Sequence, residues 1–281
     1  MIAELVGATR MFGSVVAVNG VSFGVDRGEI VGLVGANGAG KTTALRMLLG
    51  LVDPTAGTVR LFGSAPDRDA VRRIGYVPQG LGLYTDLTPR ENMAFQAGVF
   101  GFGAPASPPA LSEWWDTPVE RLPVGVRRRV AFEIAMAHMP ELLVLDEPTS
   151  GVGPLGRARL WDTIHAAAEN GTGVLVTTHY LEEAEQCDRL VMMARGQVVA
   201  TGSVDQVVGD RTAVLVRTDR PQQVANVLEP LGVMIRITAD GIRLADLDAA
   251  TVGRVVREAG VDARVEQVPA SLDETFVALS R

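Results

Sequence analysis

The chain has almost no cysteine, no excess of positive charge and no long apolar run. Cys187 is the single cysteine among 281 residues, so no disulfide can form within the chain, which is consistent with a reducing compartment. The formal net charge of -7 argues against nucleic acid as a partner of the surface as a whole. No segment reaches the roughly 18 uninterrupted apolar residues that a membrane-spanning helix needs. The first residues, Met1 to Glu4, lack the regions of a signal peptide, so we expect none. A role at a membrane would therefore have to come through a partner.

A glycine-rich loop between an apolar strand, expected at 29–34, and a helix reaching about Leu51 organises the chain. Its spacing is that of a phosphate-binding loop, G-x-x-x-x-G-K-[ST], and it reads Gly35, Ala36, Asn37, Gly38, Ala39, Gly40, Lys41, Thr42 and Thr43. Glycines let backbone N–H groups converge on an anion, and the helix N-terminus adds partial positive charge. We expect Lys41 to reach the β- and γ-phosphates of a nucleotide and the Thr42 hydroxyl to hold Mg²⁺. A plain glycine turn is the alternative, which the Lys-Thr pair and the strand-to-helix context disfavour.

An acidic pair follows the most apolar strand of the chain. Four consecutive large aliphatic residues, 142–145, predict a strand that is buried on both faces of a parallel sheet. Asp146 and Glu147 then lie at its carboxyl end, where such sheets bind ligands. We expect Asp146 to hold Mg²⁺, directly or through water, and Glu147 to orient or activate a water aimed at the γ-phosphate. The alternative for such acidic residues is to cap the following helix.

Three single residues gain a functional interpretation only from this context. His179 ends a strand at 173–178 and is expected at the same sheet edge as the acidic pair, where it could contact the γ-phosphate. In isolation, a histidine at a strand end is more often structural. Gln79 is the last residue of a strand expected at 74–79, and an exposed glutamine at a strand end is usually just solvated. Phe12 is expected in a turn at 10–14, as a core aromatic or as a ring that stacks on adenine.

The segment from about 80 to 140 differs in character from its surroundings. Thr88, Pro89 and Glu91 have the spacing of a capped helix start. Glycines and prolines break up 101–118, so we expect a loop-rich stretch that Trp114-Trp115 anchors by local packing, although exposed tryptophans could instead mark a docking surface. A helix is expected from Val124. The run Arg127-Arg128-Arg129 reads most simply as its solvated start, with phosphates or an acidic partner as the alternative.

The C-terminal part, 212–281, follows a boundary expected near 203–211. Its apolar pattern predicts a strand at 212–218, a helix near 221–230, strands near 233–238 and 241–245, a helix near 248–259 and a strand at 263–268. This β-α-β-β-α-β order is that of a small ferredoxin-like domain, and 271–279 is expected to form a terminal helix. No motif here carries chemistry, so regulation, dimer contact and stabilisation all stay open.

With these residues in hand, the first 205 or so positions resemble the ATPase domain of ABC transporters. Five elements carry the resemblance in order: Phe12, the phosphate loop Gly35 to Thr43, Gln79, the strand and acidic pair Leu142 to Glu147, and His179. The resemblance implies an α/β fold of the P-loop NTPase class, with a helical subdomain at about 80–140 and a small C-terminal α+β domain at 212–281. It also implies ATP and Mg²⁺ as ligands. Phe12 would then stack on adenine, Gln79 would contact Mg²⁺ and the attacking water, and His179 would act as the switch histidine.

Two segments depart from the family pattern. The family signature, Leu-Ser-Gly-Gly-Gln, contacts the ATP held by the opposite subunit. Here Leu122-Pro123-Val124-Gly125-Val126 takes its place, without the serine hydroxyl and with one glycine fewer. Pro123 cannot donate a backbone hydrogen bond. In Ser150-Gly151-Val152-Gly153, a glycine stands at 153 where the family usually has an aspartate that joins the subunits. Everything for the chain's own ATP is present, whereas what it offers a neighbour's ATP is weakened.

The resemblance implies an ATP-hydrolysing subunit that powers a membrane exporter from the cytoplasmic face of the membrane. A separate permease and a second ATPase subunit, identical or different, would be its partners, and no nucleic acid is expected. The asymmetry between the two sides favours a different ATPase as the partner. A homodimer with two slow sites is the rival hypothesis, and ordinary family variation would also explain the asymmetry. Two other functions stay open: a soluble ABC-type regulatory ATPase, and a nucleotide-binding subunit that barely hydrolyses. The ATPase need not touch the cargo, so the sequence leaves the cargo open.

Overall fold

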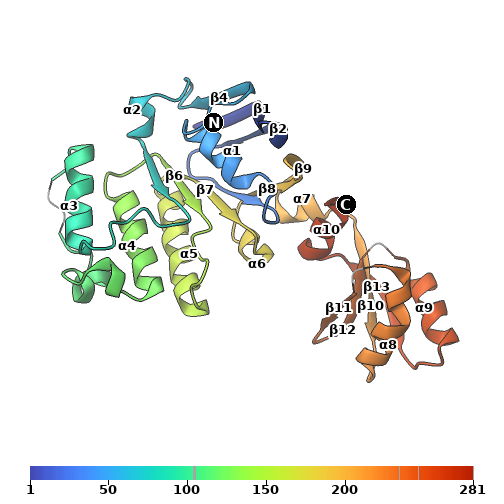
Figure 1. Ribbon diagram of the computed structural model, residues 1–281. Coiled ribbons are helices and arrows are strands. Elements are labelled where there is room, and N and C mark those ends of the chain that lie inside the picture. The colour runs from blue at the N-terminus through green and yellow to red at the C-terminus, as the bar shows by residue number, and fades with distance from the viewer. Residues whose placement is uncertain (104–105, 234, 246, 281) are drawn as a thin grey trace. The chain divides into compact units, whose positions relative to one another are not determined.

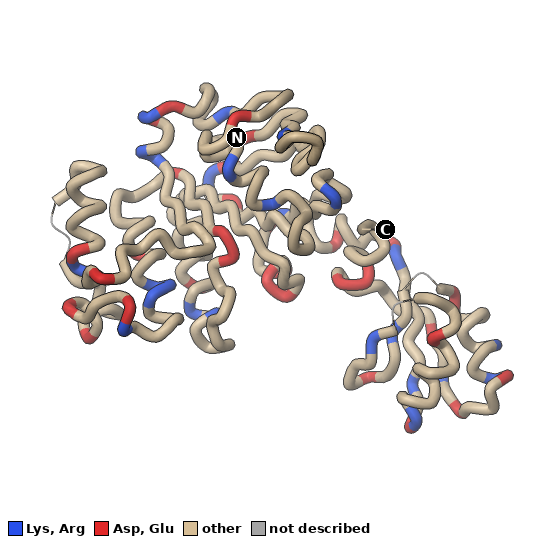
Figure 2. Tube along the Cα trace, viewed as in Figure 1, with Lys and Arg blue, Asp and Glu red and all other residues tan. Residues whose placement is uncertain are grey.

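The computed structural model of the chain describes residues 1–103, 106–233, 235–245 and 247–280. Its contacts divide the chain into two compact units, Met1–Thr201 and Gly202–Arg281. Figure 2 shows Lys and Arg interspersed with Asp and Glu along both units. Over the four described ranges, every helix is too short or too polar to serve as a membrane span.

The first unit is built on a six-stranded sheet whose inner strands are parallel. In spatial order the strands are β5 (Ile74–Val77), β6 (Leu142–Asp146), β7 (Gly173–Thr178), β3 (Ile30–Val34), β8 (Arg189–Ala194) and β9 (Gln197–Gly202). All residues of β6 are buried, which confirms the prediction of a strand covered on both faces, and β3 and β7 are buried in the same way. The register pairs Val34 with Thr178 and Asp146 with Thr177, so the carboxyl ends of these strands meet at one edge.

A second, three-stranded antiparallel sheet lies on the other side of helix α1 (Figure 1). It consists of β2 (Val15–Val25), β1 (Ala3–Phe12) and β4 (Ala56–Leu61). Helix α1 (Lys41–Leu48) places Leu45 and Leu48 in one apolar core with residues of both sheets. The expected turn at 10–14 is wrong in part, because β1 continues to Phe12 and pairs it with Val15. Two residues therefore make the turn, and Phe12 belongs to a strand.

Helices complete the first unit. They are α2 (Arg68–Val71), α3 (Pro89–Phe100), the 3₁₀ helices η1 (Pro109–Trp114) and η2 (Val119–Arg121), α4 (Val124–Met136), α5 (Pro154–Glu169) and α6 (Leu181–Ala184). The capped start of α3 is confirmed: Thr88 accepts from the N–H of Glu91, and the Glu91 carboxylate accepts in return. Trp115 is buried among apolar side chains of η1, η2, α3 and α4, so local packing explains the tryptophan pair. Residues 104 and 105 of the broken segment 101–118 lie outside the described residues.

The second unit has a four-stranded antiparallel sheet in the order β11-β12-β10-β13. Its elements are α7 (Val204–Val208), β10 (Thr212–Arg217), α8 (Pro221–Leu228), η3 (Glu229–Leu231), β11 (Ile235–Thr238), β12 (Gly241–Ala245), α9 (Ala249–Glu258), β13 (Arg264–Pro269) and α10 (Leu272–Leu279). The third strand of this set lies beside the first, which is the arrangement of the ferredoxin-like β-α-β-β-α-β order predicted from the sequence. Residue 234, in the strand predicted near 233–238, lies outside the described residues.

One element of the second unit was not predicted. Helix α7 occupies part of the segment expected as a boundary, and it begins with a capping box between Ser203 and Gln206. The Ser-x-x-Gln spacing that signals such a start is visible in the sequence. The helix is only five residues long, which is why apolar periodicity alone could not find it.

Candidate active site

The phosphate loop connects β3 to α1 and depends on its glycines. Gly38 and Gly40 have φ of 82° and 100°, in the left-handed region that side chains disfavour. A Cβ on Gly40 would lie 2.6 Å from the carbonyl oxygen of Ala17, and one on Gly35 would lie 2.4 Å from that of Met193. Neighbouring backbone therefore packs directly against the loop, so larger residues at these positions would open it.

Lys41 is the first residue of α1 and is folded back onto its own loop. Its Nζ donates to the carbonyl oxygens of Gly35 at 2.7 Å and Ala36 at 3.2 Å, and the residue is only 5% exposed. Burial lowers the pKa of the Lys41 ammonium, against the opposing attraction of Glu147 and Asp146. Lys41 is also the only lysine in the sequence. A single buried ammonium is thus fixed beside the concavity that the loop forms.

A cavity of about 660 Å³ lies over the loop. It is lined by residues 37–43, by Gln79 and Glu147, and by two segments that the sequence analysis did not single out, Val15–Ala17 and Arg195-Gly196. Its size is in the range of small-molecule sites. The missed segments are brought in by the close approach of backbone: the Cβ of any residue replacing Gly196 would meet the carbonyl oxygen of Ala17 at 2.9 Å.

Asp146 and Glu147 lie where β6 ends. Asp146 is 3% exposed, and its Oδ1 accepts a hydrogen bond from the Thr177 hydroxyl at 2.5 Å. Burial raises the pKa of the Asp146 carboxyl, although the Thr177 hydrogen bond opposes that shift. The same Thr177 oxygen accepts from the backbone N–H of Glu147 at 3.0 Å. Glu147 has φ of 50°, a left-handed conformation that costs about 1–3 kcal/mol in a non-glycine residue and is typical of functional sites.

The two carboxylate oxygens of Glu147 are engaged from different strands. Gln79, just beyond β5, donates its side-chain amide to Oε2 at 3.2 Å. His179, just beyond β7, has Nδ1 3.1 Å from Oε1. The structure therefore brings together three residues that the sequence separates by up to 100 positions, and it does so at the edge where the phosphate loop begins. A water held here would face a carboxylate, an amide and an imidazole at once.

Phe12 lies at the end of β1, paired with Val15, which lines the cavity. It is 48% exposed, which contradicts the reading as a core aromatic. The Arg10 guanidinium carbon lies 4.7 Å from its ring centroid, in cation–π contact, and its strand partner Val15 lines the cavity. The ring itself is not part of the lining of the cavity.

The residues expected to hold Mg²⁺ offer oxygen ligands of three kinds. Thr42 supplies a hydroxyl, Gln79 an amide carbonyl and Asp146 a carboxylate whose orientation Thr177 fixes. Among the residues that the structure describes, no cluster of three or more His, Cys, Asp or Glu side chains is arranged to hold a metal ion. A set with one charged oxygen ligand suits Mg²⁺, which keeps several waters and takes other ligands from substrate phosphates.

The two departing segments both begin helices without help from a side chain. Pro123 precedes α4 and Gly153 precedes α5, and within the described part of the chain neither makes a side-chain hydrogen bond to its helix. Val124, the first residue of α4, is 48% exposed. A Cβ on Gly125 or Gly153 would meet no described atom within 4 Å. Both positions therefore have room for a side chain, and the aspartate that the family usually has at 153 would fit there.

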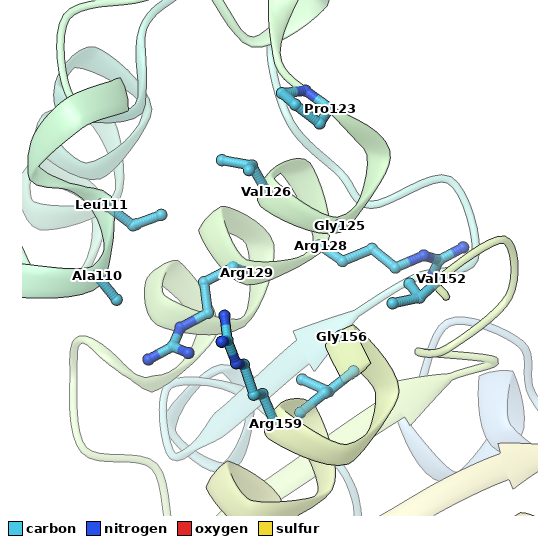
Figure 3. Close-up of a pocket in the computed structure, with 11 residues that line it drawn as sticks. Ala110, Leu111, Pro123, Gly125, Val126, Arg128, Arg129, Val152, Gly156 and Arg159 are labelled. Carbon is cyan, nitrogen blue, oxygen red and sulfur yellow. The ribbon is translucent and has the colours of Figure 1, made fainter. Parts of the chain in front are cut away.

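These segments also lie side by side. A cavity of about 290 Å³ is lined by Pro123, Gly125 and Val126 from one segment and by Val152 from the other (Figure 3). Helices α4 and α5 add Gly156 and the side chains of Arg128, Arg129 and Arg159. A Cβ on Gly151 would lie 3.8 Å from the Val124 side chain. The two departures from the family pattern thus form one continuous, largely apolar region.

The three arginines of α4 are not the solvated helix start that the sequence suggested. Arg127 donates to the carbonyl oxygens of Leu122 and Glu120 at 2.7 and 2.8 Å. Arg129 pairs with Glu133 at 2.9 Å. Arg128 extends toward the acidic strand end and donates to the carbonyl oxygens of Glu147 and Pro148 at 3.0 and 2.9 Å (Figure 3 shows its side chain). The contacts of Arg127 and Arg129 are local, whereas those of Arg128 are tertiary contacts, which periodicity cannot reveal, and they tie α4 to the segment that carries Glu147.

Comparison with known proteins gives consistent results. A family model described as ABC transporter matches residues 18–150. The probable multidrug ABC transporter ATP-binding protein YbhF of Escherichia coli (strain K12) is 38% identical over 211 residues, 71% of this chain. The chain spans only 36% of the length of that relative. The Nod factor export ATP-binding protein I of Paraburkholderia xenovorans (strain LB400) is 35% identical over 96% of this chain and 94% of its own length. A solved ATP-binding subunit of an ABC transporter has the same fold over both full chains, with a TM-score of 0.72 and 24% identity.

Proposed function

Because the chain belongs to the family of ABC transporter ATP-binding proteins, we propose that it binds Mg-ATP and hydrolyses it to power a membrane exporter. The observation that carries the proposal is Glu147, whose carboxylate lies between Gln79 and His179 beside the cavity of the phosphate loop. Hydrolysis needs a group that can take a proton from water, held next to a phosphate-binding cradle. The carboxyl ends of four strands meet at one sheet edge, which brings the proton-accepting carboxylate and the phosphate-binding loop together.

In the proposed reaction, a water oxygen forms a bond to the γ-phosphorus while the bond to the β-γ bridging oxygen breaks. The Glu147 carboxylate accepts the proton of the water, and ADP and inorganic phosphate leave. Lys41 and the backbone N–H groups of 35–43 hold the phosphate oxygens, and His179 contacts the γ-phosphate. Mg²⁺, held by Thr42, Gln79 and Asp146, supplies charge neutralisation at the β- and γ-phosphates. Phe12, with one face near Arg10, offers its ring to adenine.

We propose a separate permease as partner, with this chain at the cytoplasmic face of the membrane. Support comes from the relatives, which are named for multidrug transport and Nod factor export, and from the lack of a spanning helix in the described ranges. A second ATPase domain would close over the nucleotide. Since Pro123 and Gly153 leave this chain little to offer a neighbour's ATP, we favour a partner that is a different ATPase. The second unit would then serve in regulation or in contact between subunits.

The second candidate function is a nucleotide-binding subunit that barely hydrolyses. It is favoured by one observation, the apolar region formed by the signature segment and by 151–153, which lacks the serine hydroxyl and the aspartate of the family. In this case a second copy with the same weakened face would close over the nucleotide, and the site beside Glu147 would act mainly by holding ATP.

Turnover measurements on the full chain and on Glu147→Gln separate these functions. We expect Mg²⁺-dependent phosphate release by the native chain, alone or in a complex isolated from membranes, and its loss in Glu147→Gln with ATP binding retained. Equal phosphate release by both proteins would contradict the role of Glu147. ATP binding without release, even in the complex, would favour the second candidate. Isolation with ribosomes instead of a membrane protein would point to a soluble regulator.

A further inference from the structure

A buried carboxylate that the proposed reaction does not use lies directly behind the site. Glu183, in the short helix α6, is only 2% exposed. A buried carboxylate must be paired and hydrogen-bonded to be tolerated. The partners of Glu183 are therefore informative, because they identify what this charge holds in place.

Each oxygen of Glu183 is bonded to a different functional segment. Oε1 accepts a hydrogen bond from the hydroxyl of Thr149, and Oε2 accepts one from the hydroxyl of Thr178 at 2.9 Å. Thr149 lies two residues beyond Glu147, whereas Thr178 immediately precedes His179. Both threonines are 1% exposed. One rigid group thus spans the segment that carries Glu147 and the segment that carries His179.

The threonine on the histidine side is held a second time. The Thr178 oxygen also accepts from the backbone N–H of Tyr180 at 3.0 Å, so the residues on both sides of His179 are tied to one hydroxyl. On the other side of the carboxylate, Arg157 of α5 has Nε 3.5 Å from Oε1 and its guanidinium carbon 5.2 Å from the centroid of the Tyr180 ring. The positive charge of Arg157 therefore balances the carboxylate of Glu183, and this arginine belongs to α5, the helix that begins directly after Gly153.

We propose that Glu183 is a positioning residue that sets the distance between Glu147 and His179. The inference rests on the proposed hydrolysis only for its effect on rate, because the pairing of the two side chains can be observed without turnover. The Nδ1–Oε1 contact of 3.1 Å spans two loops that each leave a different strand. Thr177 ties the backbone of Glu147 to β7, and Glu183 adds a second connection, from Thr149 to Thr178, between the segments that follow. A displacement of about 1 Å in such a pair slows a reaction by up to roughly a hundredfold.

A merely structural role makes different predictions. If Glu183 only stabilised the fold, its loss would lower stability and leave the geometry of the site intact in the folded molecules. Glu274 provides a matched control, since it is also a buried carboxylate, 6% exposed, and is paired with Arg243 at 2.7 Å in the second unit. Glu274→Gln should lower stability without changing the environment of His179.

The test uses the histidine NMR spectrum of the full chain. The sequence has three histidines, His138, His165 and His179, so ring signals from isotope-labelled histidine are few, and His179→Gln assigns the third. In Glu183→Ala we expect the His179 signal to move toward its position in Glu147→Ala, which removes the carboxylate that Nδ1 contacts. The signals of the other two histidines should stay in place.

Kinetics give the second measurement. Glu183→Ala should bind ATP nearly as well as the native chain, while its single-turnover rate falls roughly ten- to a hundredfold. Glu183→Gln keeps one acceptor oxygen and should recover part of the rate. If Glu183→Ala does not fold, Thr149→Val and Thr178→Val replace it, because both keep the shape of the side chain. Thr149→Val removes the hydrogen bond to Glu183, and Thr178→Val removes the bonds to Glu183 and to the N–H of Tyr180.

The possible outcomes test the positioning role of Glu183 separately from the proposed hydrolysis of ATP. A His179 signal that stays in place in folded Glu183→Ala, or in both threonine variants, would overturn the positioning role. A shifted signal in a chain whose native form does not hydrolyse ATP would support the role of Glu183 and contradict the proposed hydrolysis. A rate that falls together with the affinity for ATP, while the His179 signal stays in place, would assign Glu183 to stability alone.

Discussion

The region around the chain's own phosphate loop and the region formed by 122–126 and 150–153 are built in opposite ways. In the first, buried polar groups hold one another: Lys41 donates to loop carbonyls, Asp146 accepts from Thr177, and Glu147 contacts Gln79 and His179. In the second, valine, proline and glycine start two helices with no side-chain cap from described residues. This contrast underlies our proposal that the chain handles its own nucleotide, whereas closure over that nucleotide depends on what a partner brings.

The two regions also differ in strain. The first contains a left-handed glutamate and a buried carboxyl group whose pKa is raised by desolvation, both of which oppose folding. The second has open space around Gly125 and Gly153. The features that oppose folding thus lie in the candidate active site, which is the expected pattern because functional sites often sacrifice stability.

The largest effect should come from the first region. Lys41→Ala removes the only buried ammonium at the loop, so we expect hydrolysis to fall by roughly a hundredfold or more. Single-turnover phosphate release measures it. Arg60→Ala is the control, because Arg60 forms an exposed ion pair with Glu4 and lies away from the cavity. Unchanged turnover in Lys41→Ala would refute the assignment of the site.

A smaller effect should come from the residue that joins the two regions. Arg128→Met removes two hydrogen bonds from α4 to the carbonyls of Glu147 and Pro148, so we expect the free energy of unfolding to fall by about 1–3 kcal/mol. Urea unfolding of the full chain measures the change. Arg129→Met is the matched control, since the neighbouring Arg129 forms an i,i+4 pair with Glu133, an interaction worth about 0.3–0.5 kcal/mol. Equal losses of unfolding free energy in the two variants would mean that the hydrogen bonds of Arg128 to the acidic segment stabilise the fold no more than the Arg129–Glu133 pair does.

The second region should tolerate substitutions that restore the residues of the family pattern. Gly153→Asp places a carboxylate at the uncapped start of α5, where space is available, so we expect a gain of about 0.5 kcal/mol in unfolding free energy. Gly153→Ala adds a side chain without an acceptor and serves as the control. Thermal unfolding of both variants measures the difference. A loss of stability specific to Gly153→Asp would show that glycine is required there.

The smallest effect is a pH dependence in the first region. Burial raises the folded-state pKa of Asp146 above 3.8, so its ionised form opposes folding above that pKa, and the penalty vanishes below 3.8. Asp146→Asn keeps an acceptor for Thr177 and carries no charge. Without nucleotide or Mg²⁺, we expect this variant to be more stable than the native chain at neutral pH, with a difference that shrinks as pH falls toward 3.8. If the native chain were more stable than Asp146→Asn at neutral pH, burial of the ionised Asp146 carboxylate would not oppose folding, which would contradict this prediction.

The parts of the molecule that follow local rules could be predicted from the sequence. The aliphatic run before Asp146 specified a buried strand, and parallel pairing then placed Glu147 and His179 at one edge. The capping box at Thr88 was equally local. The roles of Arg128 and Glu183 could not be found this way, because their partners lie 19 and 34 positions away and depend on how helices pack. Cavity-lining segments such as 195–196 were missed for the same reason.

The most direct test of the contrast between the two regions is the mass in solution of Glu147→Gln with and without Mg-ATP. Blocked hydrolysis should trap any closed dimer, because ATP then stays between the subunits. The account predicts that Glu147→Gln alone binds ATP and stays monomeric, whereas the same variant with Pro123→Ser and Gly153→Asp doubles its mass. If Glu147→Gln alone doubles its mass as readily as the repaired variant, the face offered to a neighbour is not weakened, and the account is wrong.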